Sequence, residues 1–532
     1  MNERTLPSAA TARQIAAADP DRSVFVSANA GSGKTHVLAQ RVINLLLRGE
    51  DPAKILCITF TKAAAANMAN RVFGTLAQWT ALDDEALDKR ISAGTGKPSD
   101  ARQRATARRL FATALETPGG LKVQTIHAFC TRLLHQFPFE ADVAARFEVL
   151  DEASTAELLN KLTLDVILEG AGDPDSPLGR ALSTAIVSAA DVTFKDVIAE
   201  TIRKRDLVTD WIARAGGLPQ AIAELTRTFG LMPGDSLAAL EDEYFSGSLI
   251  PQAEWPALMQ FLVTSDKKLD RDIAAVLDAA QKKRGRDSVE HYLQIFCTAK
   301  LEPRDRVLTA GLAKAHPAWA ERLKAEQERV CKLVARELAI RARDRTAALI
   351  TVAAAVIERY TAEKNRRGAL DYEDLIGKTL ALFGKTSAAW VLYKLDLGIN
   401  HVLVDEAQDT SPQQWDIIKT IVAEFVPGGA RDNVRRTLFA VGDEKQSIFS
   451  FQGAAPLAFA EMREHFRRLH EQSEVTFATE RLDYSFRSAA EVLLAVDTVF
   501  RQPEAFRGLT ADPTWTVHQA LPDAAPGEVE IW

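Results

Sequence analysis

Residues 27–35, "SANAGSGKT", constrain the fold more than any other stretch of the sequence. They follow the apolar run 24–26 and precede residues 35–47, where Val and Leu recur at helical spacing. A glycine-containing turn between a buried strand and a helix presents backbone N–H groups and the helix N-terminus to an anion. The stretch therefore predicts a phosphate-binding loop at the start of an α/β domain.

Each residue type in this loop has a predicted role. Gly31 and Gly33 let the backbone approach a phosphate closely, Lys34 is placed to reach the β- and γ-phosphates, and Thr35 is placed to ligate Mg²⁺. Ala28 stands where the pattern G-x-x-x-x-G-K-[ST] begins with glycine, and it is compatible with binding if its φ angle stays negative. The predicted ATP-binding residues of the loop are Ala28, Asn29, Ala30, Gly31, Ser32, Gly33, Lys34 and Thr35.

A second motif, "HVLVDEAQDT" at 401–410, places two carboxylates at the end of an apolar strand. Asp405 is suited to hold Mg²⁺, and Glu406 is suited to polarise an attacking water. A solvated strand end is the alternative interpretation of an isolated Asp-Glu pair. Together with the phosphate loop, the pair predicts an NTPase.

The distribution of apolar runs predicts how the domain is organised. Runs at 24–26, 55–58, 402–404 and 438–441 indicate buried parallel strands. Between roughly 140 and 365 the pattern is mainly helical, and residues 318–367 contain neither Gly nor Pro, which predicts one very long helix or two in series. We therefore expect an α/β domain that is split by a helical insertion.

Composition restricts the class of protein. A net charge of −7 argues against a protein whose whole surface binds nucleic acid, although a local basic groove is compatible with it. The cysteines lack C-x-x-C spacing, and no secretion signal or membrane-spanning run is visible, so we expect a soluble cytoplasmic protein without a membrane partner. The four cysteines are Cys57, Cys130, Cys297 and Cys331.

Seven short segments in order resemble the motifs of superfamily 1A DNA helicases, the UvrD/Rep/RecB-like group. Among them, "VQTIHAFC" and "ITFTKAAAANM" look closest to AddA, the helicase–nuclease subunit of bacterial double-strand-break repair. The segments are Gln14, "ITFTKAAAANM" (58–68), "VQTIHAFC" (123–130), "LDYEDLI" (370–376), "DEAQDTS" (405–411), "VGDEKQSIFSFQGA" (441–454) and "RLDYSFRSAAEVL" (481–493).

The resemblance implies an α/β P-loop NTPase fold, a RecA-like parallel sheet split by a large helical insertion and followed by the start of a second RecA-like domain. The implied divisions are motor domain 1A at 1–138 and 367–474, the insertion 1B at 139–366, and the start of domain 2A at 475–532. The later family motifs and an acidic nuclease motif are not found, so we expect the N-terminal portion of a longer protein.

The resemblance also implies roles for individual residues. Gln14 reads adenine, Gln446 senses the γ-phosphate, and Arg487 acts as an arginine finger if Phe486 replaces an aromatic neighbour of the family motif. A structural amide and a surface ion pair remain the alternatives for Gln446 and Arg487. The implied catalytic set is Lys34, Asp405, Glu406, Gln446 and Arg487, with Thr35 and Asp405 on the metal.

Further residues fall where the family binds single-stranded DNA, because aromatic faces stack on bases of any sequence. For Phe60 and Phe449, a place in the protein core is an equally good interpretation. The implied DNA-binding residues are Phe60, Thr61, Thr125, His127, Phe449 and Phe451.

The function implied by the resemblance is an ATP- and Mg²⁺-dependent 3′–5′ DNA helicase and translocase in double-strand-break repair and recombination. It would act on single- and double-stranded DNA with an AddB-type partner, and nuclease activity is implied only for a full-length member. Two alternatives remain open: a standalone UvrD-like repair helicase, and an ATP-switched single-stranded-DNA-binding module that does not unwind.

Overall fold

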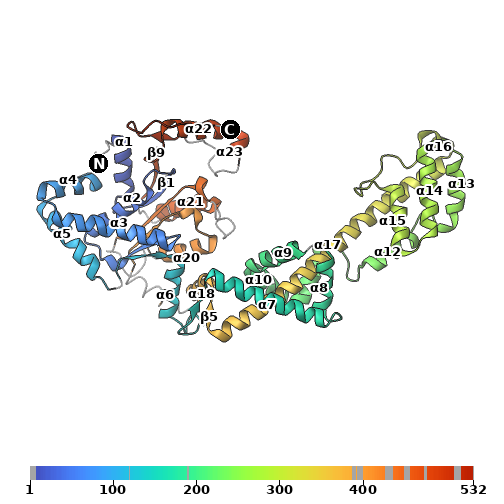
Figure 1. The fold of residues 1–532 in the computed structure, drawn as a ribbon, viewed down its shortest axis with the longest axis horizontal. Coiled ribbons are helices and arrows are strands. Elements are labelled where there is room, and N and C mark those ends of the chain that lie inside the picture. The colour runs from blue at the N-terminus through green and yellow to red at the C-terminus, as the bar shows by residue number, and fades with distance from the viewer. Residues whose placement is uncertain are drawn as a thin grey trace. The chain divides into compact units, whose positions relative to one another are not determined.

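The computed structural model shows a mixed α/β protein of two compact units (Figure 1). One unit joins Met1–Asp151 to Gly368–Trp532, and the other is Glu152–Arg367. The structure describes residues 7–118, 120–188, 191–385, 391, 399–423, 425, 435–447, 456–472, 476–507 and 517–530.

A six-stranded parallel sheet forms the centre of the first unit, in the order β3-β2-β6-β7-β1-β8. Val26 of β1 lies opposite Val441 of β7, and Ile58 of β2 lies opposite Val404 of β6. The inner strands are almost wholly buried, as the strands of a parallel sheet covered on both faces usually are. The strands are β1 (Ser23–Ala28), β2 (Ile55–Thr59), β3 (Lys122–Thr125), β6 (His401–Val404), β7 (Thr437–Gly442) and β8 (Phe477–Leu482).

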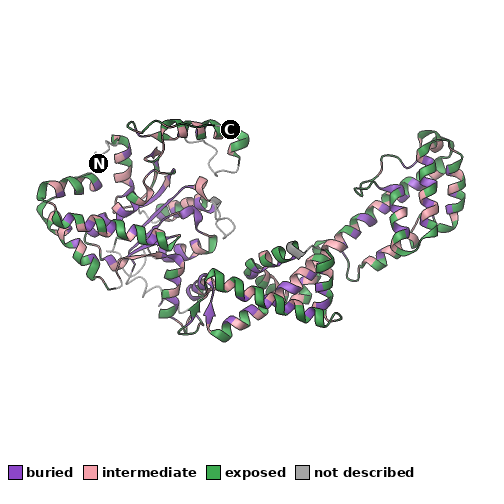
Figure 2. Ribbon diagram, in the orientation of Figure 1, coloured by how far each residue is buried: buried purple, intermediate pink, exposed green. Residues whose placement is uncertain are grey.

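Helices cover both faces of this sheet, whose strands are coloured mainly as buried in Figure 2. Alternate strand residues belong to two separate cores. Phe25 and Val404 pack with the helices of one face, whereas Val26 and Leu403 pack with those of the other. The first face carries α6 (Ile126–Gln136), α18 (Tyr372–Gly384), α20 (Pro412–Ala423) and α21 (Pro456–Gln472). The second carries α2 (Lys34–Leu47), α3 (Lys62–Ala81), α4 (Asp84–Thr95) and α5 (Ala101–Glu116).

Two boundaries differ from the divisions expected from the sequence. β8 pairs in parallel with β1, so it belongs to the first sheet and not to a separate domain that begins at 475. Residues 139–151 belong to the α/β unit, because β4 (Glu148–Val149) pairs with β5 (Ala369–Leu370). Strand partners far apart in the chain decide both boundaries, and a local sequence pattern does not reveal them. The remaining elements of the unit are α1 (Ser8–Ala17), β9 (Tyr484–Ser485), α22 (Ala490–Phe500), α23 (Pro503–Phe506) and β10 (Gln519–Ala520).

The second unit is helical and is organised along one helix, α17 (Pro317–Arg367), which is 51 residues long. Of the two alternatives expected for residues 318–367, one very long helix or two in series, the structure shows the single helix. The half containing Val330 packs with α12 (Leu237–Ser246) to α16 (Ala310–Ala315), and the half containing Val352 packs with α7 (Glu152–Gly172) to α9 (Asp191–Arg203). The other helices are α8 (Pro177–Ser188), α10 (Arg205–Ala215), α11 (Leu218–Thr228), α13 (Trp255–Val263), α14 (Lys268–Lys282) and α15 (Gly285–Phe296).

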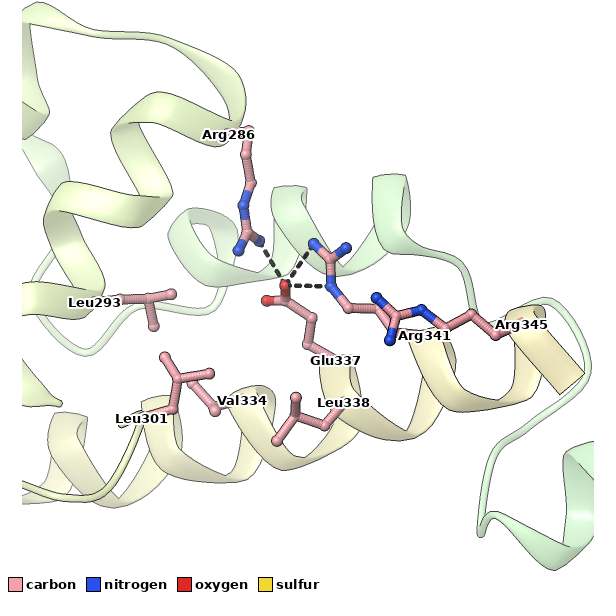
Figure 3. A pocket seen from close by; sticks show the side chains of 8 residues that line it. All are labelled: Arg286, Leu293, Leu301, Val334, Glu337, Leu338, Arg341 and Arg345. Atoms are coloured by element: carbon pink, nitrogen blue, oxygen red, sulfur yellow. Dashed lines mark hydrogen bonds and ion pairs between the residues drawn. The ribbon is translucent and has the colours of Figure 1, made fainter. Parts of the chain in front are cut away.

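A carboxylate fastens α15 to α17 within this helical unit (Figure 3). Oε1 of Glu337 accepts hydrogen bonds from Arg341 and forms a 2.8 Å ion pair with Arg286, and its Oε2 accepts a bond from the hydroxyl of Tyr244 at 3.2 Å. The side chains of Arg286, Glu337 and Arg341 border a hollow of about 290 Å³ whose apolar wall includes Leu338. Among the described helices, none combines the length and the apolar character that crossing a bilayer requires.

Candidate nucleotide and nucleic-acid site

The predicted nucleotide residues lie at the carboxyl ends of three neighbouring strands, β6, β7 and β1. β1 ends at Ala28 and leads into the phosphate loop, β6 leads into Asp405 and Glu406, and β7 leads into Asp443. The carboxyl ends of parallel strands share one edge of a sheet, where ligands of doubly wound folds bind. Three segments that are far apart in sequence therefore meet at one place.

The phosphate loop has the backbone that its glycines predict. Gly31 and Gly33 have φ angles of 71° and 86°, a region that side chains disfavour, and a Cβ at Gly31 would lie 2.8 Å from Cβ of Arg487. Ala28 pairs with Leu482 as the last residue of β1, so it is extended and needs no glycine. The first turn of α2 has no side-chain cap, so no side chain competes with an anion for the N–H groups at the start of the helix.

Lys34 of the loop forms an ion pair with Glu406. Nζ of Lys34 lies 2.9 Å from Oε2 of Glu406, across 372 residues of sequence, and the lysine side chain is only 10% exposed. Glu406 has φ 48° and ψ 46°, a left-handed conformation that costs a non-glycine residue about 1–2 kcal/mol. The fold therefore holds this carboxylate at the loop in spite of backbone strain.

Asp405 is buried beside Glu406, with 6% of its surface exposed. Burial, together with the charge of Glu406, raises the pKa of Asp405 to about 6. Its Oδ1 accepts the backbone N–H of Glu406 at 3.0 Å. A buried carboxylate next to a second one is the oxygen donor that a divalent cation stabilises, so the residues fit Mg²⁺. Within the described parts of the chain, no group of three or more His, Cys, Asp or Glu side chains is arranged as a metal site.

Gln408 connects the ends of β6 and β7, a role that the sequence analysis missed. Its Nε2 donates to Glu406 at 2.8 Å and to Oδ2 of Asp409 at 3.1 Å, and its Oε1 accepts the N–H of Asp443 at 2.9 Å. The residue is 1% exposed, and a Cβ on Gly442 would lie 2.6 Å from Oε1. Its only signal in the sequence was its position within the run "DEAQDTS".

The residues after β7 reach the phosphate loop as well. Nζ of Lys445 donates to Oδ1 of Asn29 at 2.6 Å, and Nε2 of Gln446 donates to the carboxylate of Asp443. Lys445 was not among the predicted site residues, although it lies within the quoted segment 441–454. Two lysines therefore lie at the loop: Lys34, which is the first residue of α2, and Lys445, which follows β7.

Gln14 and the segment after β8 complete the surroundings of the loop. A Cβ on Gly33 would lie 3.3 Å both from Nε2 of Gln14 and from the ring of Phe486, and the N–H of Phe486 donates to the carbonyl of Gly31 at 2.8 Å. Arg487 follows beside Gly31 and is exposed. It was expected to arrive from a second domain, but it lies in the same compact unit as the loop.

Four of the predicted DNA-binding residues lie at the carboxyl ends of the neighbouring strands β2 and β3: Thr125 is the last residue of β3, and Phe60, Thr61 and His127 follow the two strands. The hydroxyls of Thr61 and Thr125 cap α3 and α6, accepting the N–H groups of Ala64 and Ala128, so both threonines have structural roles. The ring of His127 lies 4.8 Å from that of Tyr372, and burial lowers its pKa to about 4, which keeps it neutral at pH 7. Phe60 follows β2 directly and is partly buried. Phe449 and Phe451 lie outside the described residues.

Residues 9–467 match the family described as the UvrD/REP helicase N-terminal domain. The chain belongs to the UvrD/REP helicase family. The mixed α/β fold with a parallel six-stranded sheet agrees with a P-loop NTPase of this family, and membership implies use of ATP.

Relatives of the chain are named as a subunit of an ATP-dependent helicase/nuclease. The chain is 29% identical to the protein of Desulforudis audaxviator, over 91% of this chain and 39% of that protein. It is 26% identical to the protein of Latilactobacillus sakei, over 92% and 55%, and 26% identical to that of Moorella thermoacetica, over 98% and 37%. The chain thus spans between about a third and about half of the length of these relatives.

Proposed function

We propose that this chain is the ATP-hydrolysing motor portion of a DNA helicase and translocase of the AddA helicase/nuclease type. The observation that carries the proposal is the 2.9 Å contact between Lys34 of the phosphate loop and Glu406 at the end of β6. The contact supports the proposal because a lysine of the phosphate loop and an acidic side chain after β6 lie together at the edge of the sheet. The names of the relatives support the helicase assignment.

In this proposal, ATP binds with its phosphates on the loop from Ala28 to Thr35 and its adenine near Gln14. Lys34 then pairs with the phosphates and no longer with Glu406, because the several negative charges of the triphosphate attract its ammonium group more strongly than one partly exposed carboxylate does. Glu406 keeps its bond to Gln408 and is then free to accept a proton from the attacking water. Arg487 would stabilise the charge that develops on the transferred phosphoryl group.

Thr35 and Asp405 would hold Mg²⁺. When bound, the ion would neutralise charge on the phosphates and orient them for in-line attack. The burial and raised pKa of Asp405 support this assignment. Its ionised carboxylate is poorly hydrated and is therefore strongly stabilised by a nearby cation.

Single-stranded DNA would lie across the carboxyl ends of β2 and β3, next to the nucleotide. Phe60 and His127 offer uncharged rings on which bases stack, and Gln446 after β7 would report the state of the γ-phosphate. We assign 3′–5′ movement, action on duplex DNA in break repair, and an AddB-type partner by analogy with the family. The word "subunit" in the relatives' name supports a partner.

ATP hydrolysis by residues 1–532, with and without single-stranded DNA, tests the proposal, and Glu406→Gln is the control variant. DNA-stimulated phosphate release that disappears in Glu406→Gln supports a motor. Binding of both ligands without turnover would reduce the chain to an ATP-switched DNA-binding module. Absence of ATP binding would refute the site.

A further inference from the structure

The lysine at the end of β7 contacts the phosphate loop through a neutral group. Nζ of Lys445 lies 2.6 Å from Oδ1 of Asn29, which is the second residue of the loop. Burial lowers the pKa of Lys445, so its charge is partly deprived of water. An ammonium group in this state binds an anionic oxygen more strongly than an amide oxygen.

Asn29 contributes a buried hydrogen-bond donor at the same place. Its side chain is 5% exposed, and its Nδ2 is a buried donor that has no acceptor within the described parts of the chain. Buried donors in proteins are nearly always paired, and each exception calls for an explanation. An oxygen that enters between Asn29 and Lys445 would give the Asn29 donor an acceptor and would offer the Lys445 ammonium group an anionic partner.

The strand order indicates which oxygen this is. β7 lies between β6, which supplies Glu406, and β1, which supplies the loop. In the proposed reaction, Glu406 activates water at the terminal phosphate, so that phosphate lies between the ends of β6 and β1. Lys445 follows the strand between them.

We propose that Lys445 contacts the γ-phosphate of ATP and that Asn29 holds it in place when no nucleotide is bound. The inference rests on the proposed function and adds a residue that distinguishes ATP from ADP. Binding of ATP moves the ammonium group from the Asn29 amide to the phosphate, whereas ADP leaves the Lys445–Asn29 bond intact. The end of β7, which continues into Gln446, thereby differs between the two nucleotide states.

The test compares binding of the β,γ-imido analogue of ATP and of ADP, each with Mg²⁺, by calorimetry on the whole chain. We expect Lys445→Met and Lys445→Gln to weaken binding of the analogue by about tenfold or more and binding of ADP by less than about twofold. The reason is that a hydrogen bond to a charged group is lost only with the analogue. Lys445→Arg should restore part of the preference. Lys89→Met, an exposed lysine of α4 paired with Glu85, is the matched control and should change neither affinity.

Asn29→Ala separates this role from a structural one. If Lys445 contacts the phosphate, this variant should keep its affinity for ADP within about twofold and should lose less affinity for the analogue than Lys445→Met does, because the lysine remains. If the Lys445–Asn29 bond only stabilises the conformation of the loop, Asn29→Ala and Lys445→Met will lower the affinities for the analogue and for ADP equally, and the inference is overturned. Equal losses of analogue and ADP in the Lys445 variants would also overturn it. A wild-type chain that binds neither nucleotide would instead refute the proposed function itself.

Discussion

Replacing Asp405 with asparagine should stabilise the folded chain at neutral pH while impairing Mg²⁺-dependent hydrolysis. Burial and Glu406 raise the pKa of Asp405 from 3.8 to about 6. Because the folded state binds the proton more tightly than the unfolded state, the ionised carboxylate lowers the free energy of unfolding. At about 1.4 kcal/mol for each pH unit between the two pKa values, the penalty is about 3 kcal/mol when the pH exceeds both.

The pH dependence follows from the same two values. Below pH 3.8 the carboxyl is protonated in both states and carries no penalty, and the penalty grows as pH rises from there to the folded pKa of about 6. The asparagine side chain would keep an oxygen for the N–H of Glu406 and would carry no charge. We therefore expect Asp405→Asn to gain about 3 kcal/mol at pH 8 but only about 0.5 kcal/mol at pH 4.

Thermal unfolding without nucleotide and with a metal chelator measures this difference. For a unit of this size, about 3 kcal/mol corresponds to a rise in Tm of roughly 5 °C or more. Asp416→Asn is the control, because Asp416 is 48% exposed in a surface pair with Lys419 and its loss should change stability by less than about 0.5 kcal/mol. A variant that melts below the wild type at pH 8, or that gains equally at pH 4 and pH 8, would refute the reasoning.

Three further predictions concern the same edge of the sheet. Glu406→Gln should reduce steady-state phosphate release about 100-fold or more with nucleotide affinity retained, and undiminished release would exclude Glu406 as the base. Gly442→Ala should lower the free energy of unfolding by about 1–3 kcal/mol in denaturant titrations, because the new Cβ would lie 2.6 Å from Oε1 of Gln408. A Cβ on Gly74 of α3 would meet open space, so Gly74→Ala should leave the free energy of unfolding unchanged or raise it. His127→Ala should weaken single-stranded-DNA binding, measured by fluorescence anisotropy, by about 1–3 kcal/mol. The loss should be the same at pH 6 and pH 8, because a pKa of about 4 keeps the wild-type ring neutral at both. A loss that differs between these pH values would contradict the prediction.

The apolar runs of the sequence predicted the inner strands of the sheet, but the edge strands have no such run. All four predicted apolar runs lie in β1, β2, β6 and β7, because strands with neighbours on both sides and helices on both faces are continuously apolar. The outermost strands are β3 and β8. β3 contains Lys122 and Gln124, and β8 contains Glu480 and Arg481, as suits strands with one side unpaired, so neither shows an apolar run.

Motif chemistry predicted which residues gather at the loop, but not how they are connected. Lys34 and Glu406 were expected together, and the structure brings them into contact. The bonds of Gln408 and Lys445 depend on the order of strands β6, β7 and β1, which no local pattern specifies. The structural caps made by Thr61 and Thr125 were likewise missed, since a threonine at a strand end has the same sequence signature in either role.

The strand order has a consequence for synthesis on the ribosome. Neither neighbour of β1 lies in the first part of the chain: β7 begins at Thr437 and β8 at Phe477. At about 5–20 residues per second, roughly 20–80 s separate the emergence of β1 from that of its first partner. When β7 emerges, all of the helical unit, Glu152–Arg367, has already been synthesised, whereas the apolar strand β1 has remained unpaired. Nascent chains of this protein should therefore be clients of chaperones that bind extended apolar segments.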